Sequence, residues 1–201
     1  MRVLMSHSYI LYLHGFNSSP QSFKAQCSQQ WLAKYYPNMD LAIPALHYSP
    51  AVAMERLERE YFAGGDRPLG VIGSSLGGYY AAYLHHRYGV SSALINPAVR
   101  PYDLLEDYLG INKNLYTGEE YVLEPRHMDE LLALDSPSPT IGERIYTLVQ
   151  TGDATLNYRE AALKFAHCAL WVQSGGSHEF EDFERVLPSI VNFFLSSTIQ
   201  K

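Results

Sequence analysis

Short apolar runs alternate with longer helical patterns along this chain of 201 residues, and no other feature restricts the fold as much. The apolar runs are the candidate strands, at 9–13, 40–43, 69–73, 92–95, 144–150 and 168–173. Most of them are continuously apolar, which is typical of strands covered by helices on both faces. The sequence therefore predicts an α/β fold with a mainly parallel sheet of about six or seven strands and right-handed crossovers.

The helical patterns between these runs carry apolar faces. The first has a capping-box spacing at 18–21 and an apolar residue at every fourth position: Phe23, Cys27, Trp31 and Tyr35. The last is expected to direct five apolar side chains inward: Phe180, Phe183, Leu187, Ile190 and Phe194. Because proline lacks an N–H group, we expect Pro188 to kink or split this last helix.

One region breaks the alternation. Between Asn96 and Gly142 there is no convincing strand, but two short helical patterns occur at 102–109 and 127–134, among prolines and glycines. We expect a single domain over residues 1–201, with a small helical cap inserted at about 97–142 above a binding site. The alternative is a pair of surface helices with no role in binding.

Composition excludes several classes of protein. The net charge is −6 and no basic cluster is present, so a nucleic-acid partner is not expected. Residues 1–8 hold one arginine and no long apolar core, and no stretch approaches the roughly 18 apolar residues of a membrane helix, so we expect no secretory signal, no membrane partner and a cytoplasmic location. Cys27 and Cys168 have no metal-type spacing and are expected to be free; no cofactor is expected.

The pentapeptide Gly73-Ser74-Ser75-Leu76-Gly77 joins the third apolar run to the helical pattern at 79–88. Such a strand–turn–helix projects its central side chain above the end of a sheet, and the two glycines are needed because a Cβ there would collide with the flanking elements. At a helix N-terminus, unpaired N–H groups stabilise negative charge. The motif predicts that Ser75 is a nucleophile.

A serine hydroxyl needs a base, and in this architecture the acid and the histidine follow the serine in that order. Asp153 comes directly after the run at 144–150, and His178 lies on a Gly-rich loop after the run at 168–173. Loops at the carboxyl ends of parallel strands converge on one edge of the sheet. The sequence therefore predicts Ser75, Asp153 and His178 as catalytic residues.

Other residues compete for these roles. His167 ends a helix immediately before a strand, which places it on the opposite side of the sheet from Ser75. Asp103, Glu106 and Asp107 stay open as the acid of a variant arrangement, although a solvated face of a cap helix is the favoured interpretation. His85 and His86 are adjacent on a helix and point in different directions, so they indicate no metal site.

The loop after the first apolar run reads Leu13-His14-Gly15-Phe16-Asn17. We expect the backbone N–H groups of Phe16 and Leu76 to hold the oxyanion of a tetrahedral intermediate. His14 is interpreted as a structural, hydrogen-bonded residue. Tyr79 and Tyr102 are predicted to bind substrate. Further aromatic and apolar candidates for an acyl pocket are Phe16, Tyr48, Tyr108, Leu109, Tyr116 and Tyr121.

Five segments, at 12–20, 72–79, 94–101, 151–153 and 175–178, resemble the α/β-hydrolases, and more narrowly the YqiA/YcfP family of small bacterial esterases. The resemblance implies a serine carboxylesterase or acyl thioesterase that acts on a small acyl ester or thioester, with Ser75, Asp153 and His178 in the triad positions. One departure is Asn157, where the family often has aspartate. A catalytically inactive ligand-binding or scaffold protein is the alternative, because this fold also serves without catalysis.

Overall fold

The computed structural model describes residues 8–196. Residues 1–7 and 197–201 lie outside the described part. The first of these ranges covers most of the segment in which no secretory signal is expected. The central sheet has six parallel strands in the order β2-β1-β3-β4-β7-β8. Their bounds are β1 Tyr9–Leu13, β2 Asp40–Ala42, β3 Gly70–Ser74, β4 Ser92–Ile95, β7 Ile145–Gln150 and β8 Ala169–Gln173. The predicted α/β fold with a parallel sheet is confirmed.

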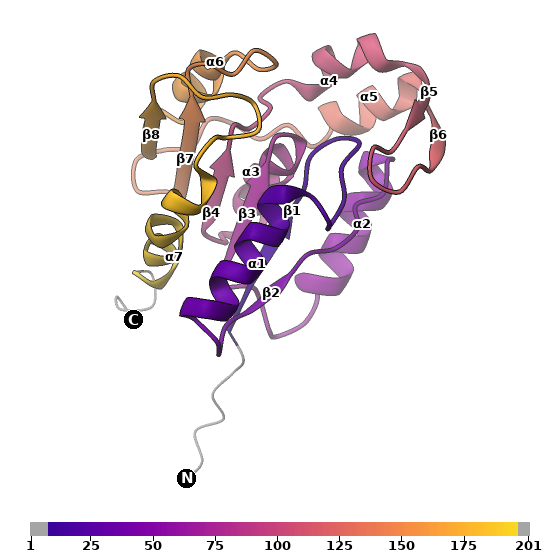
Figure 1. Ribbon diagram of the computed structural model, residues 1–201. Coiled ribbons are helices and arrows are strands. Elements are labelled where there is room, and N and C mark those ends of the chain that lie inside the picture. Colours follow the sequence, from indigo (N-terminus) through magenta and orange to yellow (C-terminus); the bar gives the residue numbers. More distant parts are fainter. Residues whose placement is uncertain (1–7, 197–201) are drawn as a thin grey trace.

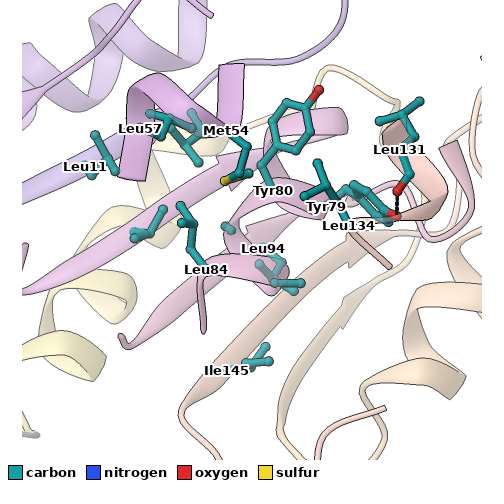
Figure 2. Packing of buried hydrophobic residues seen from close by; sticks show 14 of the residues in the cluster. Leu11, Met54, Leu57, Tyr79, Tyr80, Leu84, Leu94, Leu131, Leu134 and Ile145 are labelled. Carbon is teal, nitrogen blue, oxygen red and sulfur yellow. Dashed lines mark hydrogen bonds between the residues drawn. The ribbon is translucent and has the colours of Figure 1, made fainter. Parts of the chain in front are cut away.

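Helices cover both faces of the sheet (Figure 1). The main ones are α1 Phe23–Tyr35, α2 Pro50–Tyr61, α3 Leu76–Tyr88, α6 Tyr158–Lys164 and α7 Leu187–Leu195. Two separate buried clusters define the layers: α1 and α7 pack on one face, and α2, α3 and α6 pack on the other. Within β1, Ile10 and Tyr12 join the first cluster while Leu11 and Leu13 join the second, shown in part in Figure 2. Both faces of the central strands β1, β3 and β4 are buried, which is why their sequences are mainly apolar, whereas the apolar edge strand β8 is largely exposed.

The predicted apolar face of α1 is wrong at two of its four residues, Phe23 and Tyr35. The helix begins at Phe23 after Ser22, which makes no side-chain cap, and the expected capping box at 18–21 is absent. Phe23 and Tyr35 are 68% and 52% exposed. The buried residues of α1 are Lys24, Ala25, Ser28, Trp31 and Leu32, so Trp31 is buried as predicted, and Cys27 packs against the same core. A spacing of four drifts by about 40° per step around a helix of 3.6 residues per turn, so Phe23 and Tyr35 diverge by about 120°.

The split of the last helix is confirmed. A short 3₁₀ helix, η2, covers Phe183–Val186, and α7 then starts at Leu187 with Pro188 in its first turn. Proline is tolerated there because the first N–H groups of a helix have no partner within the helix. All five apolar residues predicted to point inward are buried.

The segment between β4 and β7 contains two strands, which the sequence analysis did not predict. It holds α4 Pro101–Leu104, η1 Leu105–Tyr108, β5 Gly110–Lys113, β6 Glu120–Leu123 and α5 Pro125–Leu132. β5 and β6 form an antiparallel hairpin, whose strands of four residues are too short and too exposed to show an apolar run. In Figure 1, the hairpin lies beside α4 and α5 at one end of the molecule.

The hairpin is hydrogen-bonded to the loop after β1. Leu115 donates its backbone N–H to Asn17 O at 3.1 Å, and Asn114 Nδ2 donates to Ser18 O at 2.8 Å. This loop carries Phe16, whose backbone N–H group is predicted to bind an oxyanion. The insertion therefore lies against the same edge of the sheet as the Ser75 turn.

Candidate active site

Ser75 occupies the turn between β3 and α3. Its backbone has φ 55° and ψ −118°, a conformation that L-residues rarely adopt and that costs about 1–3 kcal/mol. The turn is held by neighbouring elements: Ser75 N donates to Ile95 O at 3.0 Å, and Ser75 O accepts from Ala98 N at 3.1 Å. Both bonds tie the turn to β4 and the residues after it. The half-buried Ser75 side chain is thereby fixed at the N-terminus of α3.

The two glycines of the motif are required by close backbone packing. A Cβ on Gly73 would lie 2.2 Å from Gly77 O, and a Cβ on Gly77 would lie 2.1 Å from Leu13 O. Both obstacles are backbone atoms, which cannot move aside as a flexible side chain can. The steric reason given for these glycines in the sequence analysis therefore applies in the structure.

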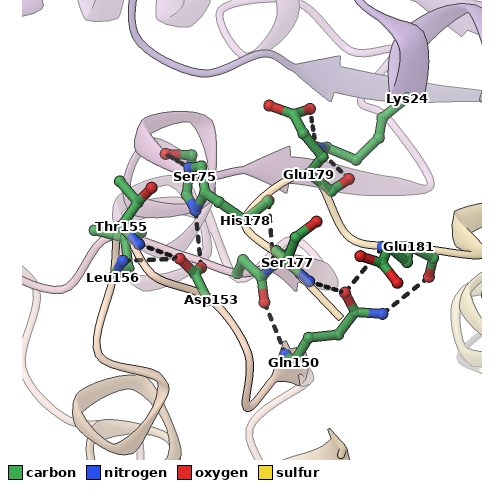
Figure 3. A network of polar contacts seen from close by, with 11 residues as sticks. Lys24, Ser75, Gln150, Asp153, Thr155, Leu156, Ser177, His178, Glu179 and Glu181 are labelled. Carbon is green, nitrogen blue, oxygen red and sulfur yellow. Dashed lines mark hydrogen bonds and ion pairs between the residues drawn. The ribbon is translucent and has the colours of Figure 1, made fainter. Parts of the chain in front are cut away.

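The structure brings Ser75, His178 and Asp153 together. His178 Nε2 lies 3.1 Å from Ser75 Oγ, and His178 Nδ1 lies 2.8 Å from Asp153 Oδ2 (Figure 3). The His178 side chain is 24% exposed, whereas the Asp153 side chain is only 2% exposed. The three residues come from the turn after β3, the loop after β7 and the loop after β8. A serine and a histidine at this distance, with a carboxylate on the other ring nitrogen, have the geometry needed for proton transfer from the hydroxyl.

Hydrogen bonds hold Asp153 in its ionised form. Burial acts to raise the pKa of Asp153, but the hydrogen bond from His178 and those from the backbone N–H groups of Leu156 and Thr155 outweigh it and hold the pKa below its usual value. Both backbone groups donate to Oδ1 at 2.8 Å, which leaves Oδ2 to His178. The carboxylate is therefore charged and fixed in orientation at neutral pH.

The loop after β1 lies against Ser75. A Cβ on Gly15 would be 3.3 Å from Ser75 Cβ, so only glycine allows the approach without displacement. Phe16 and Leu76 line the same cavity as Ser75, and neither backbone N–H donates to a protein acceptor in residues 8–196. The binding of an oxyanion by these two amides stays a prediction.

His14 has a structural environment. It is 4% exposed, accepts the Leu46 N–H on Nε2 at 3.1 Å and has Nδ1 3.0 Å from Gly15 O. Burial lowers the pKa of His14, which the Gly15 carbonyl offsets only in part. Both ring nitrogens are occupied by backbone groups, which supports the structural interpretation of this residue.

A cavity of about 600 Å³ opens above Ser75 and His178. Its walls come from the loop after β1, the first turn of α1 and the insertion. The insertion contributes Leu104, Leu105, Asp107, Tyr108, Leu115 and Tyr116. Of the predicted pocket residues, Phe16, Tyr108 and Tyr116 line this cavity, while Tyr48 and Tyr121 line a smaller one of about 80 Å³ on the other side of residues 14–18. Leu109 lines neither cavity and is 42% exposed.

The two tyrosines predicted to bind substrate do not line the main cavity. Tyr79 is 3% exposed, and its hydroxyl donates to Leu131 O at 2.6 Å, within the core shown in Figure 2. Tyr102 donates to Asp135 Oδ2 at 3.3 Å on the opposite side of the insertion. Sequence position near the motif or in the insertion does not fix the direction of a side chain. Neither tyrosine is therefore positioned to contact a substrate in this cavity, and their role in substrate binding stays a prediction.

The competing residues lie apart from the hydroxyl–imidazole pair. His167 is exposed and precedes β8, at the amino-terminal end of this strand, whereas Ser75 follows the carboxyl end of β3. Asp103 pairs with Arg100 at 3.3 Å, and Asp107 lines the cavity without contacting His178. His85 is buried, with Nδ1 2.8 Å from Val90 O.

Sequence reasoning missed three buried polar residues beside the site. Asn96 directly follows β4, Gln150 ends β7, and Lys24 lies in the first turn of α1, where it lines the cavity. Their exposures are 3%, 0% and 7%. The available signal was a polar residue at the carboxyl end of an otherwise apolar strand, which applies to Asn96 and Gln150.

Several solved structures share the α/β-hydrolase fold of this chain. A protein from Agrobacterium vitis S4 superposes with a TM-score of 0.70 at 19% identity, covering 94% of this chain and 88% of that one. Est1E from Butyrivibrio proteoclasticus, with bound ferulic acid, gives 0.66 at 14% identity, covering 96% and 90%. A monoacylglycerol lipase from Paleococcus ferrophilus gives 0.66 at 14%, covering 95% of each chain.

The family itself is shown by sequence. The profile described as "Uncharacterised protein family (UPF0227)" matches residues 9–195, so the chain belongs to that family, which is the YqiA/YcfP family. The resemblance found in the sequence is confirmed. Within residues 8–196, no helix is long and apolar enough to cross a membrane, and no group of three or more His, Cys, Asp or Glu side chains is arranged to hold a metal ion.

Proposed function

We propose that this protein is a serine hydrolase that cleaves carboxylic esters or acyl thioesters through Ser75, His178 and Asp153. The observation that carries the proposal is the hydrogen-bonded series from Ser75 Oγ to His178 Nε2 at 3.1 Å and from His178 Nδ1 to Asp153 Oδ2 at 2.8 Å. The Ser75 turn supports it, because a strained backbone at the end of a strand persists only where the surroundings enforce it. Such strain is frequent at functional sites.

In the proposed mechanism, Ser75 Oγ attacks the carbonyl carbon while its proton passes to His178 Nε2. Asp153 accepts a hydrogen bond from the Nδ1–H group of His178, which fixes the tautomer and stabilises the imidazolium. The N–H groups of Phe16 and Leu76 bind the oxyanion, and loss of one such donor typically costs about 3 kcal/mol. His178 then protonates the leaving alcohol or thiol. Water repeats these steps on the acyl-enzyme, releasing the acid and free Ser75.

The cavity supports a substrate with an apolar group of moderate size. Its volume of about 600 Å³ lies within the usual range for small-molecule sites, about 300–1,000 Å³. Phe16, Tyr108 and Tyr116 give it an aromatic wall. Bound ferulic acid in Est1E and the monoacylglycerol lipase are in keeping with an acyl ester substrate. We also assign residues 97–142 as a cap within one domain, because this insertion supplies one side of the cavity.

The first test is hydrolysis of p-nitrophenyl esters of increasing chain length, with the corresponding acyl-CoA thioesters alongside. We expect Ser75→Ala to remain folded and to lose about 10⁴–10⁶ in kcat, whereas Ser138→Ala, at an exposed serine of the cap, keeps wild-type turnover. A serine-directed phosphonate should add to the peptide that contains Ser75. Unchanged turnover in Ser75→Ala, or an adduct on another peptide, would refute the assignment.

A further inference from the structure

The loop that carries His178 has a backbone that needs external support. Gly175 and Gly176 have φ values of 75° and 74°, and Phe180 and Asp182 have φ values of 60° and 58°. Positive φ is disfavoured for residues with a side chain and persists only where the surroundings fix it. The supports of this loop therefore decide where the imidazole lies.

Gln150 binds both ends of the segment 177–181. Its side chain is fully buried at the end of β7. Oε1 accepts from Ser177 N at 3.0 Å and from Glu181 N at 2.9 Å, and Nε2 donates to Glu181 O at 2.9 Å (Figure 3). One carboxamide thus satisfies three backbone groups, one before His178 and two after it.

Asn96 binds the first two carbonyls of the same segment. It follows β4, and its Nδ2 donates to Ser177 O at 2.9 Å and to His178 O at 3.2 Å. Its Oδ1 accepts from Gln150 N at 2.9 Å, which joins the two carboxamides. The next carbonyl, Glu179 O, accepts from Lys24 Nζ at 2.9 Å. Three consecutive carbonyls of the loop are therefore held by two buried side chains, Asn96 after β4 and Lys24 of α1.

The packing between Gln150 and the loop leaves no space for rearrangement. A Cβ on Gly176 would lie 2.1 Å from Gln150 Oε1, and a Cβ on Gly152 would lie 2.3 Å from Gly176 O. Gly152 N also donates to Gly175 O at 2.8 Å, which connects the loop of Asp153 to the loop of His178. The contacts of Gln150 and Asn96, together with this backbone bond, hold the loop of His178 against the loop of Asp153.

We propose that Asn96 and Gln150 are positioning residues that hold His178 between Ser75 and Asp153 through the cycle. The inference rests on the proposed function, in which the imidazole alternates between neutral and cationic forms. Amide side chains supply donors and acceptors without a net charge, so they hold the loop in both forms and do not compete with Asp153 for the cation. A carboxylate of the same shape would lack the donors and add a buried charge.

Gln150→Met and Asn96→Asp test the proposal, with Gln173→Met as the matched control. Gln173 lies opposite Gln150 in the β7–β8 register, and it contributes its backbone carbonyl to Thr151 N. We expect Gln150→Met and Asn96→Asp each to lose about 10²-fold in kcat with KM unchanged, since displacing a catalytic group by about 1 Å has this effect. The control should keep wild-type kcat and KM.

A second readout does not depend on turnover. The His178 Nδ1 proton in the bond to Asp153 gives a downfield NMR resonance, assigned by its loss in Asp153→Asn. We expect this resonance to weaken or disappear in Gln150→Met and Asn96→Asp, and to persist in Gln173→Met. If the wild-type protein hydrolyses no ester, the proposed function fails, and the resonance still reports whether the two carboxamides position the ring.

Circular dichroism and thermal unfolding establish that each variant is folded. If Gln150→Met does not fold, Gln150→Glu replaces it, because glutamate keeps both acceptor bonds, loses the bond donated to Glu181 O and adds a buried charge. A folded variant at position 96 or 150 that retains both the wild-type kcat and the His178 resonance would overturn the proposal.

Discussion

Replacing Asp153 by asparagine changes the proposed catalytic step with almost no change in shape. Asp153 Oδ1 accepts from the N–H groups of Thr155 and Leu156 at 2.8 Å each, and Oδ2 lies 2.8 Å from His178 Nδ1. An asparagine has one oxygen and one NH₂ group. The oxygen must face the two backbone donors, because the opposite orientation would direct the NH₂ group at two N–H groups. The NH₂ group therefore faces His178.

This orientation reverses the histidine tautomer. Nδ1 becomes an acceptor for the asparagine NH₂ group, so the ring proton moves to Nε2, which lies 3.1 Å from Ser75 Oγ. A protonated Nε2 cannot take the proton of the hydroxyl. We expect kcat to fall by about 10⁴, as a wrong tautomer does in other triads. At 1.36 kcal/mol for each factor of ten, this is roughly 5 kcal/mol of activation free energy.

The assay is steady-state hydrolysis of a p-nitrophenyl ester at neutral pH, after circular dichroism has shown that the variant is folded. We expect KM to stay the same, because Asp153 lies behind His178 and does not line the cavity. Asp107→Asn is the matched control, since it removes a carboxylate that does line the cavity, and its kcat should stay close to wild type. A folded Asp153→Asn protein whose kcat falls less than about tenfold would refute the assignment of the acid and the tautomer argument with it.

Three further predictions concern stability. Gly77→Ala should lower the free energy of unfolding in urea by about 1–3 kcal/mol, because the new Cβ would lie 2.1 Å from Leu13 O. Tyr79→Phe should lower it by about 1–2 kcal/mol and leave KM unchanged, because it removes the bond to Leu131 O at 2.6 Å in the core. The pKa of Asp153 is held below its ordinary value of 3.8, so its ionisation stabilises the fold above that pH. The difference in unfolding free energy between wild type and Asp153→Asn should therefore shrink as the pH falls through the lowered pKa.

Controls and contrary results for these predictions are specific. Gly65→Ala is the control for Gly77→Ala, because a Cβ at Gly65 meets nothing within 4 Å, and equal stability of the two variants would contradict the packing argument. A raised KM in Tyr79→Phe would return Tyr79 to the substrate site. A stability difference for Asp153→Asn that stays constant from neutral to acidic pH would show that the carboxylate has no depressed pKa.

Features set by neighbouring residues could be predicted from the sequence. The apolar runs define the central strands β1, β3 and β4 because burial on both faces disfavours polar residues along a strand. The motif around Ser75 is visible because its glycines are required by backbone contacts that any strand–turn–helix of this kind makes. Asp153 and His178 could be selected because loops at the carboxyl ends of parallel strands meet at one edge.

Directions of side chains could not be predicted with the same success. Phe23 and Tyr35 do not lie on the buried face of α1, and Tyr79 and Tyr102 lie outside the main cavity, because each side-chain direction depends on which neighbour packs against the residue. The β5–β6 hairpin was missed because its strands have no buried apolar run and are ordered partly by bonds to the loop after β1.

The sequence by itself determined the α/β fold, the family and the three residues that meet at the carboxyl edge of the sheet, because these follow from local pattern and chain order. The tertiary structure decided which residues line the cavity and how the histidine loop is held. Asn96 and Gln150 lie 82 and 28 residues from His178 along the chain, and only strand pairing brings their carboxamides to its backbone. Contacts of that kind leave no periodic signal, because each needs a single polar side chain at the end of a strand.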